Sequence, residues 1–316
     1  MSSIGLYSHL PDRLEQVTDA QRLFHGRGRT VPGLEHLVVD YYPPALVVTH
    51  FGPGALSTEE LALRQGELTQ WSREVLGGSD TSVPIIFQER GVRPARSQLL
   101  VGDRDDLPDP HWVTEAGLQF RVDLFRGQNH GLFLDMAEGR RWLRDRSAGR
   151  QSVLNLFAYT CSLSVAAMAG GAEYVVNLDM AGGALTTGKR NHAQNGFDRD
   201  VSYLPHNLFK TFGKLRKAGP FDIIVVDPPS HQPGSFVAAK DYPKVIRKLP
   251  ELLNADGEIA EALLCLNAPE LGTDFLLGMV AEHAPELEFV RRLPNPKTFP
   301  DADPEAGLKA LLFRAS

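Results

Sequence analysis

Apolar runs and helical segments alternate along the second half of the chain. Seven apolar runs have the length of buried strands, at residues 153–157, 174–178, 201–204, 221–226, 259–265, 287–293 and 308–314. Helical segments stand between most of them, at residues 163–169, 183–194, 208–217, 237–253 and 274–283. This alternation predicts an α/β fold with one seven-stranded, Rossmann-like sheet. Only a short proline-rich loop separates the last two runs, so the final two strands should be antiparallel. Pro243 and Pro250 should lie near the ends of their helix or kink it.

Residues 1–112 have a less regular pattern. Apolar runs at 37–40 and 46–49 predict a hairpin, residues 84–87 predict a further strand, and a loop with Arg93 and Arg96 follows. Ser57 and Glu60 have the spacing of a capping box at the start of an amphipathic helix over 56–76. The acidic, proline-bearing stretch 102–110 is the best candidate for a linker. We therefore predict a small α+β domain over residues 1–112 and the α/β domain over 113–316.

The α/β domain begins with alternating residues. Positions 113–125 place apolar and polar side chains on opposite faces, which predicts a half-buried strand that forms half of a leading β-hairpin. A loop at 127–131 and a helix through Trp142 and Leu143 follow.

Residues 153–179 form a βαβ pattern that ends on a carboxylate. In such sheets, ligands bind beyond the carboxyl ends of the strands, where Asp179 could accept hydrogen bonds from a ribose diol. The first turn has no glycine between Asn155 and Gly170, so it lacks the glycines with which a dinucleotide fingerprint approaches a pyrophosphate. This argues against NAD and favours a nucleoside cofactor without phosphates, namely S-adenosylmethionine. A βαβ unit that binds nothing is the alternative.

The sequence Asp227-Pro228-Pro229-Ser230 follows the strongest apolar strand. The prolines fix the backbone and remove donors, which leaves carbonyl groups and a carboxylate as acceptors. Such a rigid cradle suits the exocyclic amine or ring edge of a base. A proline-stiffened strand end without function is the simpler interpretation of this motif alone.

Composition narrows the class of protein. The chain has 316 residues, of which 42% are hydrophobic and 23% charged, and its net charge of −6 argues against general adhesion to nucleic acid. Neither a signal peptide nor an apolar run long enough to span a membrane is apparent. The two cysteines, Cys161 and Cys265, form no metal-ligand pattern or disulfide framework, so we expect no metal and a reducing cytoplasm.

An RNA-binding protein of this charge would need local basic faces. Three groups of basic residues are candidates, although each is more typical of a solvated surface. They are Arg140, Arg141, Arg144, Arg146 and Arg150; Lys210, Lys214, Arg216 and Lys217; and Lys240, Lys244, Arg247 and Lys248.

Three motifs together resemble a known family. NLFAYTCSLSVAAMAGGA, VNLDMAGGALTTGKRNHAQNG and FDIIVVDPPS are similar to the class I S-adenosylmethionine-dependent methyltransferases that modify bacterial 23S rRNA. The group nearest in resemblance makes 5-methylcytosine, and a sister group makes 7-methylguanine. Upstream segments such as GLFLDMAEGRRWL and IIFQERG extend the resemblance to about residues 22–316. About 21 residues precede this region, so we expect the group's N-terminal PUA-type RNA-binding domain to be missing.

The resemblance implies roles for individual residues. Asp179 would bind the ribose hydroxyls, Asn207 would meet the adenine amine, and Asp227, Pro228 and Pro229 would face the target base. The full set implied for the cofactor is Phe133, Asp135, Asn155, Phe157, Ala158, Tyr159, Thr160, Cys161, Ser162, Asp179, Met180, Asn207, Leu208 and Asp227.

The chain departs from the family pattern at three of these places. Cys161 stands where the family has a glycine, so a side chain is expected beside the cofactor. Asn207 replaces an Asp, whose amide oxygen can still accept a hydrogen bond. Met136-Ala137 replaces Gln-Arg.

Cys265 decides between two reaction types. Methylation of carbon 5 of a pyrimidine requires a nucleophile at carbon 6, usually a thiolate, whereas methylation of a guanine nitrogen requires only alignment. Cys265 follows the fifth strand, where the cytosine group has a cysteine, but a buried free cysteine is also typical of a strand end.

The sequence predicts a methyltransferase acting on a base of ribosomal RNA. Cytosine C5 is favoured slightly over guanine N7, and residues 1–112 could recognise the RNA. The alternatives are a non-catalytic adaptor that binds RNA or protein, and a small-molecule methyltransferase. No membrane partner is expected, and the oligomeric state, a homodimer included, is left open.

Overall fold

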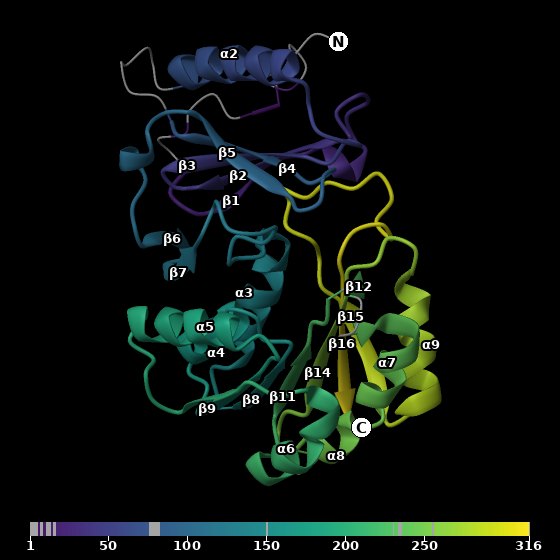
Figure 1. Cartoon of the computed structure of the whole chain (residues 1–316). Coiled ribbons are helices and arrows are strands. Elements are labelled where there is room, and N and C mark those ends of the chain that lie inside the picture. Colours follow the sequence, from purple (N-terminus) through teal and green to yellow (C-terminus); the bar gives the residue numbers. More distant parts are fainter. Residues whose placement is uncertain are drawn as a thin grey trace. The chain divides into compact units, whose positions relative to one another are not determined.

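A computed structural model describes residues 6, 9–10, 14, 17–75, 83–149, 151–229, 231–232, 236–254 and 256–315. Contacts divide the chain into two units (Figure 1). Unit 1 comprises Met1–Leu134 and Lys297–Ala302, and unit 2 comprises Asp135–Pro296 and Asp303–Ser316. This division falls after residue 134, whereas the predicted domain boundary at residue 112 stays a prediction.

The strands of unit 2 that the structure describes form the predicted seven-stranded sheet, in the order β10-β9-β8-β11-β14-β16-β15. They are β8 (Ser152–Leu156), β9 (Tyr174–Leu178), β10 (Val201–Leu204), β11 (Ile223–Val226), β14 (Glu261–Leu266), β15 (Leu287–Arg292) and β16 (Lys309–Ala315). The first five are parallel, and β16 runs antiparallel to both of its neighbours, as predicted. Strand order reverses direction between β8 and β11, which is where such sheets bind ligands.

Helices cover both faces of this sheet, because alternate strand residues point to opposite sides. Val153, Val225 and Leu263 pack with α3 (Ala137–Arg146) and α4 (Ser162–Gly170). Leu154 and Leu264 belong to the opposite core. That core includes side chains from α6 (Phe212–Ala218), α7 (Ala238–Ile246), α8 (Leu249–Leu252) and α9 (Thr273–His283).

Two predicted helices are broken. The segment at 208–217 is a 3-10 turn, η4 (Leu208–Lys210), followed by α6. The segment at 237–253 divides into α7 and α8, with Pro243 inside α7 rather than near an end. Pro250 lies in the first turn of α8, where a missing N–H is tolerated. A helix α5 (Gly182–Gln194) follows β9 as predicted, and the short strands β12 (His231–Gln232) and β13 (Phe236–Val237) were not predicted.

Unit 1 contains a five-stranded sheet in the order β1-β2-β3-β4-β5. Its strands are β1 (Gln21–His25), β2 (Leu37–Tyr42), β3 (Ala45–His50), β4 (Ile85–Glu89) and β5 (Arg96–Val101), and η1 (Gly26–Gly28) follows β1. The β2–β3 hairpin and β4 were predicted. Strands β1 and β5 were not, and Arg96 begins β5 where a loop was expected.

The helix α2 (Thr58–Val75) starts as the sequence predicts. Ser57 Oγ accepts from the Glu60 N–H at 3.2 Å, and Glu60 Oε2 accepts from the Ser57 N–H at 2.8 Å. This reciprocal pair is a capping box, which satisfies two backbone donors at the helix start.

The single strand predicted over 113–125 was wrong, because this region contains both halves of the hairpin. Ala116 (φ 50°) and Gly117 (φ 79°) turn the chain between β6 (His111–Glu115) and β7 (Leu118–Val122). The hairpin belongs to unit 1. The predicted linker at 102–110 joins β5 to β6 and contains η2 (Arg104–Asp106), and η3 (Leu134–Met136) precedes α3. Among the described helices, none is long and apolar enough to cross a membrane.

Glu261 fixes the edge of unit 2 through two arginines. Its side chain is almost completely buried and accepts from Arg146 Nε at 2.7 Å and from Arg314 Nη2 at 2.7 Å. Burial raises the pKa of this carboxyl group, but the hydrogen bonds from Arg146 and Arg314 prevail and hold the pKa below its usual value.

Glu261→Gln should therefore lower the free energy of unfolding by about 2 kcal/mol, because both arginines lose their carboxylate. The loss should be largest at neutral pH and shrink as pH falls through the lowered pKa, where the wild-type carboxylate also becomes neutral. Urea unfolding at several pH values measures this, with the exposed Glu258→Gln as the matched control. Equal stability of both variants would contradict the interpretation.

Candidate active site

The carboxyl ends of five parallel strands meet at one edge of the unit 2 sheet. Asn155 is in register with Asn177 on β9 and Val225 on β11, and Val225 is in register with Leu263 on β14. Asp179, Asn207, Asp227 and Cys265 follow or end these strands. The sequence-predicted residues of unit 2 are therefore gathered at a single edge.

The turn after β8 has an unusual backbone. Phe157, Tyr159 and Cys161 have φ angles of 60°, 48° and 62°, a region that non-glycine residues rarely occupy. Asp179 holds this turn to β9, since its Oδ2 accepts the Tyr159 N–H at 2.8 Å and its Oδ1 accepts the Ala181 N–H at 2.7 Å. Strain of this kind persists only where the surroundings fix it, which is typical of binding sites.

The Cys161 side chain does not occupy the cofactor side of the turn. Its sulfur is completely buried, in a small core with Ala158 and Leu185. A Cβ atom at Gly188 of α5 would lie 2.4 Å from Cys161 Sγ, so the glycine makes room for the thiol. The expected crowding of the cofactor by Cys161 is therefore avoided, because the side chain points toward α5.

Three residues at the ends of β9 and β10 fit an adenosine group. Met180 is 56% exposed and offers an apolar surface next to Asp179. Asn207 Nδ2 lies 3.6 Å from Met180 Sδ, while its Oδ1 accepts the Phe209 N–H at 2.9 Å and caps η4. The carboxylate and amide oxygens retain further lone pairs for hydroxyl and amine donors.

Other predicted cofactor residues contribute main chain only. Leu208 is 3% exposed, so its side chain belongs to the core. Asn155 is buried and donates from Nδ2 to Asn177 Oδ1 at 3.0 Å. Among the described residues, Asn155 Oδ1 and Asn177 Nδ2 have no hydrogen-bond partner, so one acceptor and one donor remain beneath the turn. Thr160 is also buried, and its carbonyl oxygen accepts from Asn191 Nδ2 at 2.9 Å.

Asp227 lies at the centre of this edge, directly after β11. Its pKa is raised to about 7, chiefly by burial and then by the Asp135 carboxylate, against a lowering effect of Arg140. Arg140 is 3% exposed, and its Nη1 donates to Ser162 Oγ at 3.4 Å. Asp227 therefore gains or loses a proton close to neutral pH, as a residue that handles protons requires. Pro228 is buried and Pro229 half-buried, and Ser230 lies outside the described residues.

Cys265 lies on the same side of the sheet as Leu263, facing α3 and α4. It is completely buried, and burial, followed by the Asp227 and Asp135 carboxylates, raises the pKa of its thiol well above the usual value. The Tyr242 hydroxyl donates to the Cys265 carbonyl oxygen. The thiol is thus within electrostatic range of Asp227, in surroundings that disfavour the thiolate.

Sequence reasoning missed several residues of this edge. Tyr242 and Phe236 form an aromatic chain with Phe157, with ring centroids 5.3 Å and 5.2 Å apart. Arg140 was grouped with surface arginines although it is buried. Its sequence signal was its place one turn after Asp135, on the face that also carries Leu143.

Phe133 is assigned to unit 1 and is 40% exposed, so its predicted contact with the cofactor stays a prediction. Asp135 begins unit 2. No group of three or more metal-ligating side chains comes together in the part of the chain that the structure describes.

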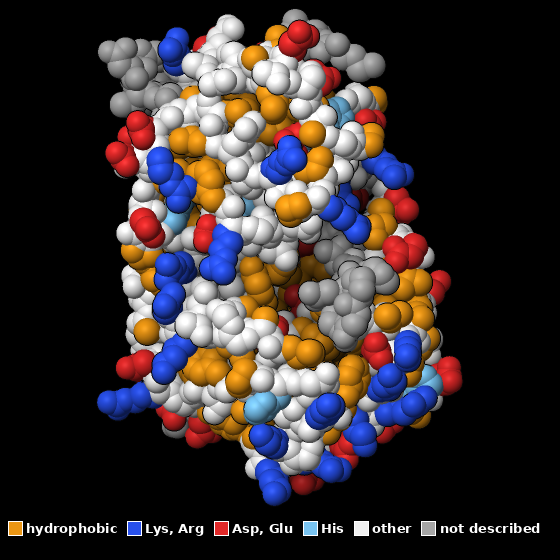
Figure 2. Space-filling view, viewed as in Figure 1, with side chains coloured by type: hydrophobic (Ala, Val, Ile, Leu, Met, Phe, Trp, Pro, Cys, Tyr) orange, Lys and Arg blue, Asp and Glu red, His pale blue; other side chains and the backbone are white. Residues whose placement is uncertain are grey.

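Most of the predicted basic faces are balanced by acids. The ion pairs are Arg141–Glu138, Arg146–Glu261, Arg216–Glu251, Lys244–Asp241 and Lys248–Glu251, while Arg150 lies outside the described residues. Figure 2 shows Lys and Arg interspersed with Asp and Glu over the viewed face. These clusters therefore offer less free positive charge than their sequences suggest.

Comparison with known families agrees with this geometry. The profile described as S-adenosylmethionine-dependent methyltransferase matches residues 21–314. The chain therefore belongs to this family of methyltransferases, and S-adenosylmethionine is its cofactor.

Among curated relatives, a ribosomal RNA large subunit methyltransferase of Bacillus subtilis is 30% identical over 245 residues, which cover 74% of this chain and 58% of that protein. Ribosomal RNA large subunit methyltransferase I of Shewanella denitrificans is 29% identical over 95% of this chain and 75% of its own length. The chain thus spans under two thirds of the Bacillus protein. A solved Streptococcus mutans SAM-dependent methyltransferase superposes with a TM-score of 0.79 at 24% identity, covering 95% and 76% of the two chains. A methyltransferase solved in complex with SAH matches equally well, with a TM-score of 0.79 and 24% identity over 95% and 76% of the two chains.

Asp179→Ala should weaken binding of S-adenosylmethionine by about 1–3 kcal/mol, because a ribose acceptor is lost and the Tyr159 and Ala181 N–H groups lose their partner. Isothermal calorimetry measures this. Asp179→Asn keeps an acceptor oxygen and should bind more tightly than the alanine variant. Unchanged affinity in both variants would exclude Asp179 from the cofactor site.

Asp227→Asn should stabilise the protein more at about pH 8.5 than at about pH 5. The folded-state pKa of Asp227 lies above its unfolded value, so the native state holds an extra proton between them, and its stability falls as pH rises toward about 7. The amide carries no charge and avoids this loss. Thermal unfolding at both pH values measures the difference, and the exposed Asp145→Asn should show none. A gain that is independent of pH would refute the raised pKa.

Proposed function

We propose that this protein transfers a methyl group from S-adenosylmethionine to a base of large-subunit ribosomal RNA. The observation that carries the proposal is the position of Asp227-Pro228-Pro229 at the same sheet edge as the Asp179-bound turn. The names of the Bacillus and Shewanella relatives support the choice of RNA. Such a substrate is met in the cytoplasm, as the cysteine usage suggested.

The chain's own groups divide the work at this edge. When bound, S-adenosylmethionine supplies an electrophilic methyl group. Asp179, Met180 and Asn207 bind the adenosine part, and the strained turn 157–161 presents main-chain groups to the rest. Asp227 and the two prolines hold the edge of the base, which places it for transfer without further rearrangement.

Cytosine C5 is the first choice of target. In this reaction the Cys265 thiol passes its proton to the ionised Asp227, and its sulfur forms a bond to carbon 6. Carbon 5 then takes the methyl group, a base removes the proton from carbon 5, and the thiolate leaves. The electrostatic effect of Asp227 on the Cys265 thiol supports this pairing of residues.

Guanine N7 is the second choice, and one observation favours it. The Cys265 thiol is completely buried and its pKa is raised, which are properties of a structural cysteine. A ring nitrogen with a free lone pair needs alignment but no covalent adduct.

A non-catalytic adaptor and a small-molecule methyltransferase remain as alternatives. A carboxylate held near neutral pKa at the base edge supports catalysis over an adaptor role, because stability alone gives no reason to keep it. Purified protein that carries neither S-adenosylmethionine nor its demethylated product, and does not bind them, would favour the adaptor.

Cys265→Ala should abolish transfer of tritiated methyl groups to ribosomal RNA if cytosine C5 is the target, because no other thiol lies beside Asp227 in the described residues. Binding of S-adenosylmethionine, measured by calorimetry, should be unchanged. Cys265→Ser should be equally inactive, since a hydroxyl is a far weaker nucleophile. Full activity of Cys265→Ala would exclude the cytosine mechanism, and mass mapping of the methylated RNA would then test guanine N7.

A further inference from the structure

Three loops of unit 1 meet at one end of its five-stranded sheet. His25, Thr49 and Gln88 are joined through β2 and β3 by strand register, so the loops that follow β1, β3 and β4 emerge together. These loops carry Arg27, Phe51 and Arg90. None of these three side chains was among the candidates of the sequence.

Two guanidinium groups lie over one aromatic ring. The Arg27 guanidinium carbon is 4.4 Å, and that of Arg90 is 5.3 Å, from the centroid of the Phe51 ring. Arg90 Nη2 also donates to Gln128 Oε1 at 3.1 Å. Cation–π contacts orient the guanidinium planes without neutralising their charge.

Positive charge is in excess around this ring. In the described part of the chain no ion pair joins Arg27 or Arg90 to a carboxylate. The nearby Asp40 is taken by Arg22, at 2.8 Å from Nε and 3.1 Å from Nη2.

The excess charge acts on its neighbours. The pKa of His25 is lowered to about 3, first by burial and then by Arg22 and Arg27. Burial also lowers the pKa of Arg90, and the charge of Arg27 lowers it further. An anion between Arg27 and Arg90 would relieve their mutual repulsion.

Glycines fix the backbone beneath these side chains. A Cβ atom at Gly91 would lie 1.8 Å from the Gly52 carbonyl oxygen, so the residues after Phe51 and Arg90 touch through their main chains. A Cβ atom at Gly28 would lie 1.8 Å from the Pro300 carbonyl oxygen, and the Gly28 oxygen accepts the Ala302 N–H at 2.7 Å. The loops are therefore held in place before any ligand arrives.

We infer that Arg27 and Arg90, stacked on Phe51 beside Gln128, bind a backbone phosphate of the RNA substrate. This inference rests on the proposed function, since it names where that RNA is held. Guanidinium groups donate paired hydrogen bonds to phosphate oxygens, and Gln128 adds an amide donor. The site contrasts with the basic groups of unit 2, of which several members are already paired with carboxylates.

The test uses the full chain and a fluorescein-labelled single-stranded fragment of 23S rRNA. Arg27→Gln and Arg90→Gln should each weaken binding about tenfold in fluorescence anisotropy. The double variant should also lower the slope of log affinity against log salt by about 1.4, from about 0.7 for each phosphate lost on a single strand. Binding of S-adenosylmethionine should be unchanged in all variants.

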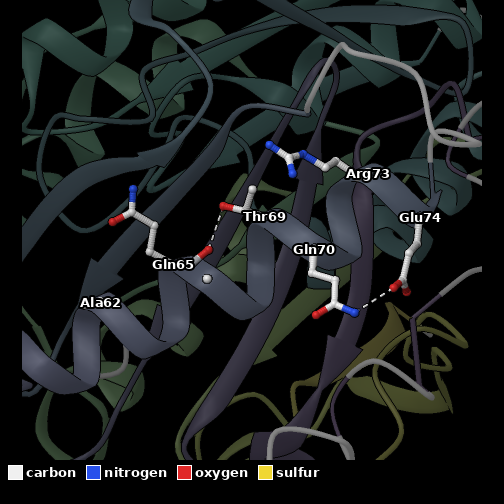
Figure 3. Close-up of a pocket in the computed structure, with 7 residues that line it drawn as sticks. Ala62, Gln65, Thr69, Gln70, Arg73 and Glu74 are labelled. Carbon is white, nitrogen blue, oxygen red and sulfur yellow. Dashed lines mark hydrogen bonds between the residues drawn. The ribbon is translucent and has the colours of Figure 1, made fainter.

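Arg73→Gln is the matched control for the loss of one positive charge. Arg73 lies in the same unit, on the exposed side of α2, in a shallow pocket that also contains Gln70 and Glu74 (Figure 3). RNA affinity of this variant should stay within about twofold of wild type, because removal of one exposed charge away from a contact has little effect. Arg27 is itself exposed, so Arg27→Gln should fold even if Arg90→Gln does not.

The outcomes separate this site from the proposed function. Wild type that methylates ribosomal RNA, together with Arg27→Gln and Arg90→Gln variants of unchanged affinity, would overturn the phosphate site alone. Wild type that binds the fragment but transfers no methyl group, with affinity lost in the arginine variants, would support the site and overturn the function. Inorganic phosphate that raises the thermal midpoint of wild type but not of the double variant, with equal RNA affinity in both, would assign the site to free phosphate and overturn RNA as its ligand.

Discussion

The bond between the Asp179 carboxylate and the Tyr159 N–H fixes the conformation on which the candidate active site depends. Phe157, Tyr159 and Cys161 all have positive φ angles, which cost about 1–3 kcal/mol each for residues with side chains. The turn is bound to β9 by Asp179 and to α5 by Asn191, so its neighbours hold it open. The same carboxylate has lone pairs left for a ribose, which couples the shape of the turn to the cofactor.

The replacement of the family's glycine by Cys161 is accommodated on the next layer of the structure. At φ 62° a glycine would be free of strain, and any side chain must leave the turn on the side of α5. Gly188 provides that space, and Leu185 and Ala158 complete an apolar lining. The substitution therefore moves a packing requirement to α5 without placing an obstacle beside the cofactor.

The sheet could be predicted from sequence because its signals are local. Apolar runs, their spacing and the short final loop were sufficient for seven strands and for the antiparallel end, and Asp179 could be located because it ends a strand. What failed depends on distant partners. Strand β5 is half-polar and forms because β4 offers an edge, Arg140 is buried by its packing, and the direction of Cys161 is set by Gly188. No periodicity within a segment carries such information.

The charges of the two units serve different requirements. At the base edge of unit 2, Asp135 and Asp227 keep negative charge in a buried place, and Arg140 offsets it only in part, as the pKa of Asp227 shows. Acidic groups there would repel a phosphate backbone, although they suit the amine edge of a base. A protein of net charge −6 must therefore attract RNA elsewhere, through positive charge that its own carboxylates do not cancel. Because salt screens exposed charges beyond about 10 Å, a few unpaired guanidinium groups can decide local affinity whatever the total charge. Arg27 and Arg90, which share one ring and have no carboxylate partner among the described residues, meet that requirement.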